Sequence, residues 1–463
     1  MAKLFSSLCV PALLAALLAV PVAGAAPVLM ISVDGMRPDA VLEADAHGLK
    51  IPFLRSMLRD GSFARGVTGV FPTVTYPSHT TLITGVAPRE HGIYGNLEFD
   101  PLHQHADSWY WYANQMRAPT LWHAAHAAAM TTASIGWPVS VGATDVDFLI
   151  PEYWRISRPT SELNESDRHL IAALARPEGL LHDMDKSAGP YLMGNDTSIG
   201  ADEIKTRYAL EILRAHKPKF MTIHLSSLDH AEHEHGVFSD EANQVLEAID
   251  AQLARLFAAA LANDPNAIAV VVSDHGFAPI TRRLNLYQPF IRANLLQASS
   301  DARGRTKVTA WRAQPWPAGG MAAIMQNPTD PANDEEVRRL LRTLQADAAN
   351  GIDEILERDA ARARGGFPDA AFLVLMKPGY YLSDDPMHNL LTELSGSHGT
   401  HGYSPDLPEM RSSFFIAGRG IARNRDLGLI DMRQIAPTVA GVLKVSLPSA
   451  QAPALPVNKP MRP

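Results

Sequence analysis

Val28-Leu-Met-Ile-Ser-Val-Asp-Gly35 is the first stretch that indicates a fold class. Its first six residues form a continuous apolar run, which predicts a strand buried on both faces and places Asp34 at the C-terminal tip of that strand. Segments with helical spacing, such as residues 201–216 and 239–262, alternate with runs of this kind. Because strands that alternate with helices form mostly parallel sheets covered on both faces, the sequence predicts an α/β fold.

Two further predicted strands end in an acid in the same way. Residues 218–228 lead to Asp229, and residues 267–273 lead to Asp274. Parallel sheets bind ligands outside the carboxyl ends of their strands, and Asp34, Asp229 and Asp274 are all expected at that edge. We therefore expect three carboxylates to converge on one site.

The sequence changes character along the chain. Residues 285–394 contain short strand-like and helical segments that indicate a small α+β unit inserted into a larger domain. Within the larger domain, residues 51–60 have helical spacing, and Gly61 is expected to end that helix in the left-handed conformation. The predicted organisation is a signal peptide over residues 1–25, a main domain over 26–284 and 395–448 that carries the candidate site, the inserted subdomain over 285–394, and a loosely ordered Pro-rich tail over 449–463.

The composition limits the class of protein. The chain has 463 residues, of which 46% are hydrophobic and 19% are charged, as expected for an ordered globular protein. Its formal net charge is −8 and no basic run stands out. These two features argue against a groove for nucleic acid.

Residues 1–25 have the features of a secretory signal, because an apolar run is followed by the small residues Ala23-Gly-Ala25. A retained anchor would need about 20 apolar residues, and this run is shorter and interrupted by Pro11 and Pro21. We therefore expect a secreted or periplasmic protein with no stable membrane anchor after signal removal. The one cysteine, Cys9, lies in this segment, so the mature chain would have no disulfide, thiol nucleophile or thiolate metal ligand.

A second informative stretch is Phe71-Pro-Thr-Val-Thr-Tyr-Pro-Ser-His-Thr-Thr-Leu-Ile-Thr-Gly85. It reads as a loop that turns into a helix, which places Thr75 or a neighbouring hydroxyl near free backbone N–H donors and the positive end of a helix dipole. Such a position can hold a phosphate group. An ordinary capped helix start is the plain alternative for this stretch.

Carboxylates and imidazoles at the predicted strand ends favour a metal site. Asp229 and His233 are four residues apart and can face one ion, Asp274 and His275 form a second pair, and His401 lies in a glycine-flanked loop. Mixed Asp and His ligands without thiolates favour Zn²⁺, with Mn²⁺ or Co²⁺ as alternatives. Two divalent ions would balance three aspartates and one threonine deprotonated by the metal.

Taken together, these segments resemble the nucleotide pyrophosphatase/phosphodiesterases of the alkaline phosphatase superfamily. The resemblance implies an alkaline-phosphatase-like sheet between layers of helices. The matching segments run in family order along nearly the whole chain and comprise the Asp34-Gly35 strand end, Pro72-Thr-Val-Thr-Tyr-Pro-Ser-His79, His91-Gly-Ile-Tyr-Gly-Asn96, Asp229-x-x-x-His233 with His235-Gly236, Ser273-Asp-His-Gly-Phe277 and Gly399-Thr-His-Gly-Tyr403.

The resemblance also implies roles for particular residues. Thr75 would be the nucleophile and would become a phosphothreonine. His401 matches the Gly-x-His-Gly pattern of the family, whereas its neighbour His398 does not. The implied ligands are Asp34, Thr75, Asp274 and His275 for one zinc ion, and Asp229, His233 and His401 for the other.

Four further residues are implied in substrate binding. Asn96, together with the Thr75 backbone amide, would bind the non-bridging phosphoryl oxygens. Tyr76 stands where the family places an aromatic ring that stacks on a nucleobase. Tyr153 and Trp154 are candidates for the opposite wall, and packing in the core is an equal alternative for these two.

The function implied is that of a secreted two-zinc hydrolase acting on the phosphodiester or pyrophosphate bonds of a small-molecule phosphoester, such as a nucleotide. A phosphomonoesterase of the same superfamily is one alternative. A diesterase for glycerophosphodiesters or lipid headgroups is another. From a different class, the chain could be an inactive periplasmic protein that keeps the fold and binds metal.

Overall fold

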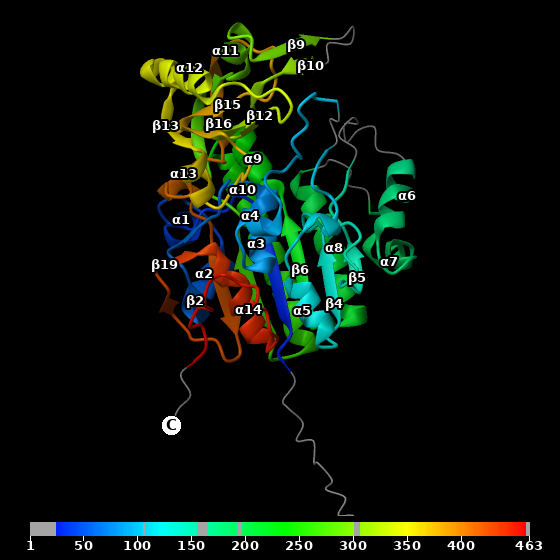
Figure 1. Ribbon diagram of the computed structural model, residues 1–463. Helices are drawn as coiled ribbons and strands as arrows, with labels where there is room; N and C mark the ends of the chain where they lie inside the picture. Colours follow the sequence, from blue (N-terminus) through cyan, green and yellow to red (C-terminus); the bar gives the residue numbers. More distant parts are fainter. Residues whose placement is uncertain (1–24, 105–107, 155–164, 192–196, 301–305, 460–463) are drawn as a thin grey trace, which may run out of the picture.

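The computed structural model describes residues 25–104, 108–154, 165–191, 197–300 and 306–459 (Figure 1). The signal peptide expected at residues 1–25 therefore lies, apart from Ala25, outside the described residues, and so does Cys9.

The centre of the molecule is an eight-stranded sheet. Its neighbouring strands pair in parallel except at β17, which runs antiparallel to both of its neighbours. The expected mostly parallel α/β sheet is thus confirmed. The order across the sheet is β18 (Arg425–Asp426), β2 (Gly61–Phe63), β17 (Phe414–Gly418), β7 (Ile268–Val272), β1 (Val28–Val33), β6 (Phe220–Leu225), β4 (Thr132–Ile135) and β5 (Phe148–Ile150).

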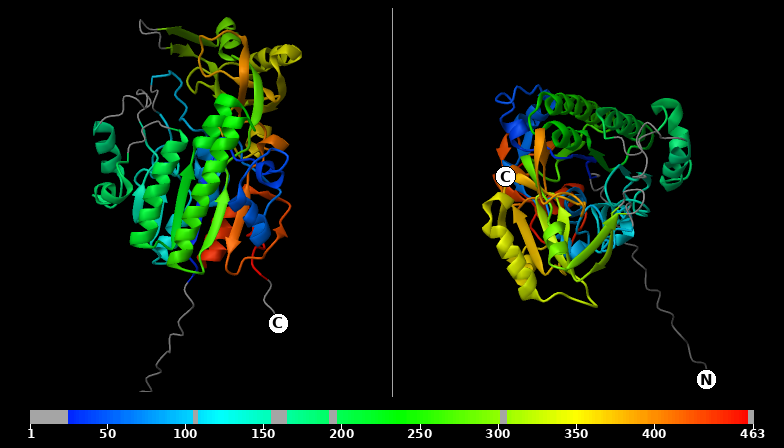
Figure 2. Two further views of the ribbon diagram at one scale, coloured as in Figure 1. Left: turned by 180° about the vertical axis from the view of Figure 1, so that it is seen from behind. Right: turned by 90° about the horizontal axis from the view of Figure 1, so that it is seen from above.

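Strand β1 is buried on both faces because helices cover both sides of the sheet. Leu29, Ile31 and Val33 face one core, whereas Val28 and Met30 face the other, as the two-residue period of a strand requires. The view from behind shows the green helices α8 and α10 lying along the sheet (Figure 2). The first core is covered by α1 (Asp39–Leu42), α2 (Pro52–Asp60), α6 (Glu165–Leu174), α7 (Leu180–Ala188), α8 (Ile199–His216) and α10 (Asp240–Asn263), and the second by α3 (Thr75–Thr84), α5 (Leu121–Ala127) and α14 (Ile435–Leu443).

A second group of smaller sheets lies beyond the carboxyl ends of the central strands, at the top of Figure 1. It has its own apolar core, which includes Phe290, Leu341 and Phe372. One sheet is antiparallel, in the order β11 (Ala313–Ala318), β12 (Met321–Gln326), β14 (Phe372–Met376) and β13 (Ile352–Glu357). The other strands are β9 (Leu296–Ser300) paired with β10 (Thr306–Trp311), and β15 (Gly379–Leu382), β8 (Ala278–Leu284) and β16 (Leu391–Thr400) in one sheet, with helices α11 (Tyr287–Arg292), α12 (Asp334–Ala346) and α13 (Arg358–Ala363).

The chain passes into this second group and returns from it beside the carboxyl edge of the central sheet. Strand β8 begins three residues after His275, and β16 ends directly before His401. The borders at residues 285 and 394 stay a prediction, and the sheet of β15, β8 and β16 spans both of them. Further elements are a small sheet of β3 (Gly66–Thr68) and β19 (Leu429–Asp431), and the helices α4 (Pro88–His91) and α9 (Ser227–His235).

Two local expectations were wrong. Gly61 is extended, with φ −139°, and begins strand β2. A Cβ at this position would lie 2.1 Å from the carbonyl oxygen of Ile416, so glycine allows β17 to approach closely. Residues 449–459 are not loose, because Leu455 and Val457 are buried and Leu455 N–H donates to Thr438 Oγ1 at 2.8 Å.

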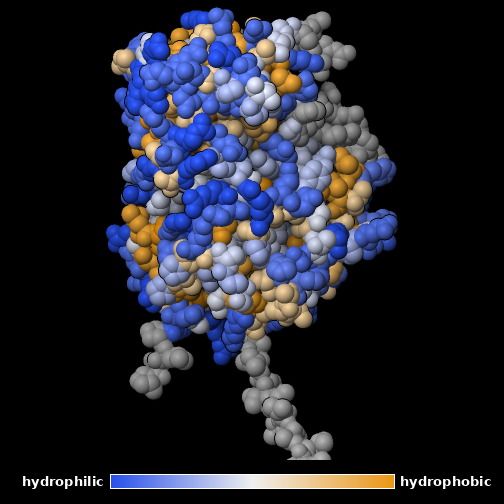
Figure 3. All heavy atoms as spheres, viewed as in Figure 1, coloured by the Kyte–Doolittle hydropathy of each residue, from blue (hydrophilic) through white to orange (hydrophobic). Residues whose placement is uncertain are grey.

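The surface is mixed in character. On the face in Figure 3, apolar residues form small groups among hydrophilic ones, which is normal for globular proteins. Among the described residues, no helix combines the length and the apolar character that are needed to cross a membrane.

Candidate metal centre

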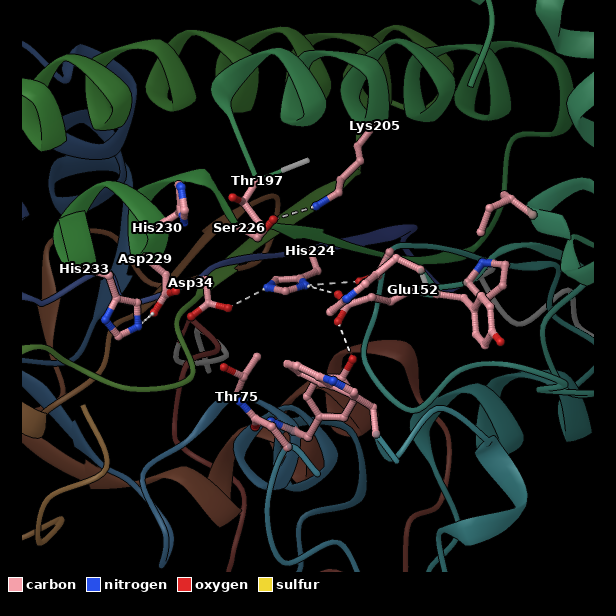
Figure 4. A pocket seen from close by; sticks show the side chains of 18 of the residues that line it. Asp34, Thr75, Glu152, Thr197, Lys205, His224, Ser226, Asp229, His230 and His233 are labelled. Carbon is pink, nitrogen blue, oxygen red and sulfur yellow. Dashed lines mark hydrogen bonds and ion pairs between the residues drawn. The ribbon is translucent and has the colours of Figure 1, made fainter. Parts of the chain in front are cut away.

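The three acids predicted at strand ends come from three neighbouring strands. Asp34 follows β1 and Asp274 follows β7, whereas Asp229 lies in the first turn of helix α9 (Ser227–His235), which follows β6. Strand β1 pairs in parallel with both β6 and β7. The shared direction of these strands brings the acids to the same edge of the sheet, as Figure 4 shows for Asp34 and Asp229.

Two groups of three side chains have ligand atoms within 4.8 Å of one another: Asp34, Asp274 and His275 form the first group, and Asp229, His275 and His401 the second. His275 belongs to both, with Nε2 lying 3.1 Å from Asp274 Oδ2 and 3.4 Å from Asp34 Oδ1. The division expected from the resemblance differs, since it assigns His275 to the first ion alone. His233 is in neither group, although its Nε2 lies 3.5 Å from Asp229 Oδ1.

The three histidines are oriented by the backbone. Because a carbonyl oxygen only accepts hydrogen bonds, Nδ1 of each ring carries a proton, and Nε2 is the nitrogen that is left to bind a metal. Burial lowers the pKa of His401 well below its usual value, and the charges of His275 and His233 lower it further. Nδ1 of His233, His275 and His401 donates to the carbonyl oxygens of Gly399, Gly276 and Thr73 at 2.9, 3.2 and 3.1 Å.

The carboxylates have oxygen atoms without hydrogen bonds. Asp34 Oδ1, Asp229 Oδ1 and Asp274 Oδ2 are buried and accept no hydrogen bond from any described residue. Burial raises the pKa of Asp34 well above its usual value, and the charges of Asp274 and Asp229 raise it further. Buried acceptors of like charge are unfavourable unless a cation lies between them. This donor set therefore fits a divalent metal.

Thr75 is the first residue of α3 and is 8% exposed. Val74 before it is extended, with φ −131° and ψ 161°, so the chain enters the helix from the loop that the sequence predicts. Thr75 Oγ1 lies 3.4 Å from His275 Nε2. The threonine hydroxyl thus faces the metal-ligand cluster at the positive end of a helix dipole.

A cavity of about 310 Å³ opens beside this cluster. All the side chains expected in the substrate pocket line it, namely Tyr76, Asn96, Tyr153 and Trp154. Asn96 Oδ1 accepts the N–H of Tyr76 at 3.0 Å, which leaves the amide NH₂ group free for another partner. Tyr153 and Trp154 also pack on Trp111, with ring centroids 5.0 and 4.6 Å apart, so these two residues combine packing with a place in the wall.

The sequence reading missed His224 and Glu152, which also line the cavity. His224 Nε2 is 2.9 Å from Asp34 Oδ2, and His224 Nδ1 is 2.8 Å from Glu152 Oε2 (Figure 4). Two signals pointed to them. His224 is a polar ring inside the apolar run of β6, where a polar group needs a partner, and Glu152 directly precedes Tyr153.

Lys205 was missed as well. This buried side chain of α8 lines the cavity, and its Nζ donates to Ser226 Oγ at 3.0 Å and to Asp202 Oδ1 at 3.2 Å. Lys205 is therefore a cation in the wall whose charge is balanced by Asp202.

The sequence is similar to a known protein family and to curated proteins. A model of the family described as type I phosphodiesterase / nucleotide pyrophosphatase matches residues 28–404. Ectonucleotide pyrophosphatase/phosphodiesterase family member 1 of Rattus norvegicus is 22% identical over 260 residues, which are 54% of this chain and 24% of that protein. A human bis(5'-adenosyl)-triphosphatase is 24% identical over 56% of this chain and 49% of its own length. This chain thus spans about a quarter to a half of these curated relatives.

Solved structures share the fold. Human ectonucleotide pyrophosphatase/phosphodiesterase 5 matches with a TM-score of 0.61 and 18% sequence identity, over 94% of this chain and 97% of that one. An inactive Thr-to-Ala variant of the murine protein, in complex with AMP, matches with the same TM-score and coverage at 19% identity.

Proposed function

This chain belongs to the type I phosphodiesterase / nucleotide pyrophosphatase family, and we propose that it is a two-zinc hydrolase that acts through a phosphothreonine intermediate on Thr75. Its substrates would be phosphodiester or pyrophosphate bonds of nucleotides or related small esters. The observation that carries the proposal is the position of Thr75 Oγ1, at a helix start and 3.4 Å from His275 Nε2. We also propose secretion or periplasmic export, on the basis of residues 1–25.

The proposed ligands follow the resemblance. Asp34, Thr75, Asp274 and His275 hold one zinc ion, and Asp229, His233 and His401 hold the other. The buried carboxylate oxygens without partners and the Nε2 lone pairs support this assignment. When bound, the two ions would supply positive charge that lowers the pKa of the threonine hydroxyl and stabilises the entering and leaving oxygens.

The reaction has two displacements at phosphorus. In the first, Thr75 Oγ1 gives up its proton to solvent and bonds to phosphorus, while the bond from phosphorus to the leaving oxygen breaks and that oxygen takes the electron pair and a proton from solvent. In the second, water enters from the side of Asp229, bonds to phosphorus and gives up a proton to solvent, while the bond from phosphorus to Thr75 Oγ1 breaks and that oxygen takes a proton from solvent. Asn96 and the Thr75 N–H at the helix start donate to the non-bridging oxygens in both steps.

The aromatic wall supports a nucleotide substrate. We propose that a nucleobase stacks on Tyr76 and is bounded by Tyr153 and Trp154, which line the same cavity. The murine relative of the same fold holds AMP in its solved structure, which is compatible with this class of ligand.

The test of the nucleophile uses a nitrophenyl diester of a nucleotide as substrate. Thr75→Ala should lower kcat by about 10³-fold or more while metal content measured by mass spectrometry shows that zinc is retained, and Thr75→Ser should keep part of the activity. Unchanged hydrolysis by Thr75→Ala with zinc still bound would reject the proposal and favour an inactive metal-binding protein with a contaminating activity.

The class of ester is tested by comparing that diester with nitrophenyl phosphate. We expect a higher kcat/KM for the diester, because Lys205, the one Lys or Arg that lines the cavity among the described residues, is balanced by Asp202. A preference of about 10²-fold or more for the monoester would assign the protein as a phosphomonoesterase.

A further inference from the structure

Four side chains form a continuous hydrogen-bonded chain through the cavity wall. They come from segments far apart in the sequence, and Figure 4 shows the chain running from Asp34 through His224 to Glu152. Its last member is Tyr76, whose hydroxyl donates to Glu152 Oε1 at 2.6 Å. The chain therefore joins a proposed metal ligand to the aromatic ring proposed to bind the base.

At the first end of the chain, the two oxygens of Asp34 have different surroundings. Oδ2 is bonded to His224 Nε2 at 2.9 Å, whereas Oδ1 accepts no hydrogen bond from the described residues and lies 3.4 Å from His275 Nε2. The bond to Oδ2 fixes the rotation of the carboxylate. Oδ1 is consequently aimed into the metal-ligand cluster before any metal arrives.

Further along the hydrogen-bonded chain, Glu152 holds the orientation of the His224 ring, which in turn holds the Asp34 carboxylate. Its Oε2 is 2.8 Å from His224 Nδ1, which also lies 3.1 Å from the carbonyl oxygen of Gly136. Burial alone would raise the pKa of Glu152, but the hydrogen bond and the charge of His224 lower it below its usual value, so this buried carboxylate is an anion. A charged acceptor holds a ring more firmly than a neutral carbonyl does.

We propose that His224 and Glu152 are positioning residues, which orient Asp34 for metal binding and hold the Tyr76 ring in the substrate pocket through one shared carboxylate. Partners of this kind, one bond away from metal ligands, typically change metal affinity 10- to 100-fold when they are removed. The expected change in zinc affinity rests on the proposed function. The expected change in the positions of the His224 and Asp34 side chains rests on the hydrogen-bonded geometry alone.

The matched control is a buried hydrogen-bonded network on the same strand. Thr222 lies two residues before His224 on β6, and its hydroxyl bonds to Ser134 Oγ at 2.8 Å and to Trp122 Nε1 at 3.1 Å. Both residues are buried, but Thr222 has no hydrogen bond to the metal-ligand cluster. Thr222→Val thus measures the cost of a buried polar bond that does not orient a ligand.

The experiment measures zinc affinity by competition with a chromogenic chelator. We expect His224→Ala to weaken zinc binding at the Asp34 site about 10- to 100-fold and Glu152→Ala about tenfold, with Thr222→Val unchanged. The double variant should bind zinc no more weakly than His224→Ala alone, because Glu152 acts through His224. Independent, additive losses, or equal losses in Thr222→Val, would overturn the proposal.

Measurements of KM distinguish the effect at Tyr76 from the effect at Asp34, the two ends of the hydrogen-bonded chain. Tyr76→Phe keeps the ring and removes the bond to Glu152, so it should raise KM severalfold at unchanged zinc affinity, whereas Glu152→Ala should change both quantities. An unchanged KM in Glu152→Ala, measured with zinc at saturation, would reject the link to Tyr76.

A crystal structure of metal-free Glu152→Ala tests the geometry without zinc. We expect the His224 ring to turn and the distance from Nε2 to Asp34 Oδ2 to exceed about 3.5 Å, the limit for a hydrogen bond. An unmoved ring and carboxylate would refute the proposal even if the wild-type protein bound no zinc. Absence of zinc binding and hydrolysis in the wild type, with the ring displaced in the variant, would instead reject the proposed function alone and support the positioning role.

Discussion

Asp229 Oδ1 is the atom around which the second half of the candidate metal centre is arranged. It lies 3.5 Å from His233 Nε2 and 3.6 Å from His401 Nε2, and it accepts no hydrogen bond from the described residues. Its negative charge is therefore available to a cation, and no neutral side chain of the same size could offer it.

From this geometry we expect Asp229→Asn to lose one of two zinc equivalents and to lower kcat at least 10²-fold, because the remaining ligands of that ion are neutral. Zinc content by mass spectrometry after dialysis checks the stoichiometry. Asp45→Asn is the control, since Asp45 is an exposed carboxylate that pairs with Arg55 at the surface. Two equivalents retained by Asp229→Asn would exclude this carboxylate from the ligand set.

At this scale, the sequence is informative where a residue stands at a recognisable position of its own element. Asp34 and Asp274 follow buried strands, and Thr75 begins a helix, so their places could be predicted. The partners of His224 could not be predicted, because its hydrogen bonds join it to Asp34 and Glu152, which precede it by 190 and 72 residues in the sequence. No local pattern encodes contacts over such distances.

Among the elements, helix α9 owes its position to a side chain of another helix. Its own N-cap residue, Ser226, makes no side-chain cap. Asp202 of α8 takes that role, because its carboxylate accepts the N–H groups of Ser226 and Ser227 at 3.1 and 2.9 Å. Since α9 carries Asp229 and His233, Asp202 determines where two proposed metal ligands lie.

Asp202→Ala should therefore destabilise the protein and weaken zinc binding together. Losing the cap and leaving Lys205 unpaired in a buried site should cost about 3–5 kcal/mol of unfolding free energy, measured in urea. We also expect a drop in zinc affinity of about tenfold. Zinc affinity that stays at the wild-type value would show that the start of α9 is held without Asp202.

Asp250 offers a comparison in the same protein. It accepts the N–H groups of Phe53 and Leu54 at 3.0 and 2.7 Å, and so caps α2, which carries none of the proposed ligands. Asp250→Ala should cost about 1–2 kcal/mol of unfolding free energy, with zinc affinity unchanged. A loss of affinity equal to that of Asp202→Ala would attribute both effects to general destabilisation.

Elements were predictable where their signals are local. Helix α10 (Asp240–Asn263) lies within one residue, at each end, of the helical spacing over residues 239–262, and Ser239 Oγ accepts Ala242 N–H at 3.2 Å directly before it begins. Gly61 was misread because glycine after a helix usually means a left-handed cap, whereas here it allows close contact with Ile416, far along the chain. The reversed direction of β17 likewise has no signature within its own five residues.

Over the whole molecule, the proposed ligands tie together segments from residue 34 to residue 401. The loop with His401 also contacts the second group of sheets, because Gly320 N–H donates to the carbonyl oxygen of His401 at 2.9 Å. A metal bound between these segments would stabilise the folded state of both parts, since the unfolded chain holds no such site.

Removal of metal should accordingly lower the melting temperature. At free zinc 100 times above its dissociation constant, binding at one site adds about 2.7 kcal/mol to the free energy of unfolding. Differential scanning fluorimetry with excess chelator, and then with zinc restored, checks this shift. The Asp229→Asn protein should show a smaller shift than the wild type, and identical shifts would place the stabilising metal elsewhere.

At the scale of the molecule, sequence patterns predicted the α/β class and the edge that carries the site. They did not predict the packing of residues 449–459. Leu455 and Val457 are isolated apolar residues in a proline-rich stretch, and only the tertiary structure supplies the core that buries them.

The return of the chain at β16, directly before His401, has a consequence for biosynthesis. A ribosome that has not yet translated residue 401 has produced a nascent polypeptide without the full set of proposed metal ligands. The candidate metal centre can therefore assemble only after nearly the whole polypeptide has been synthesised.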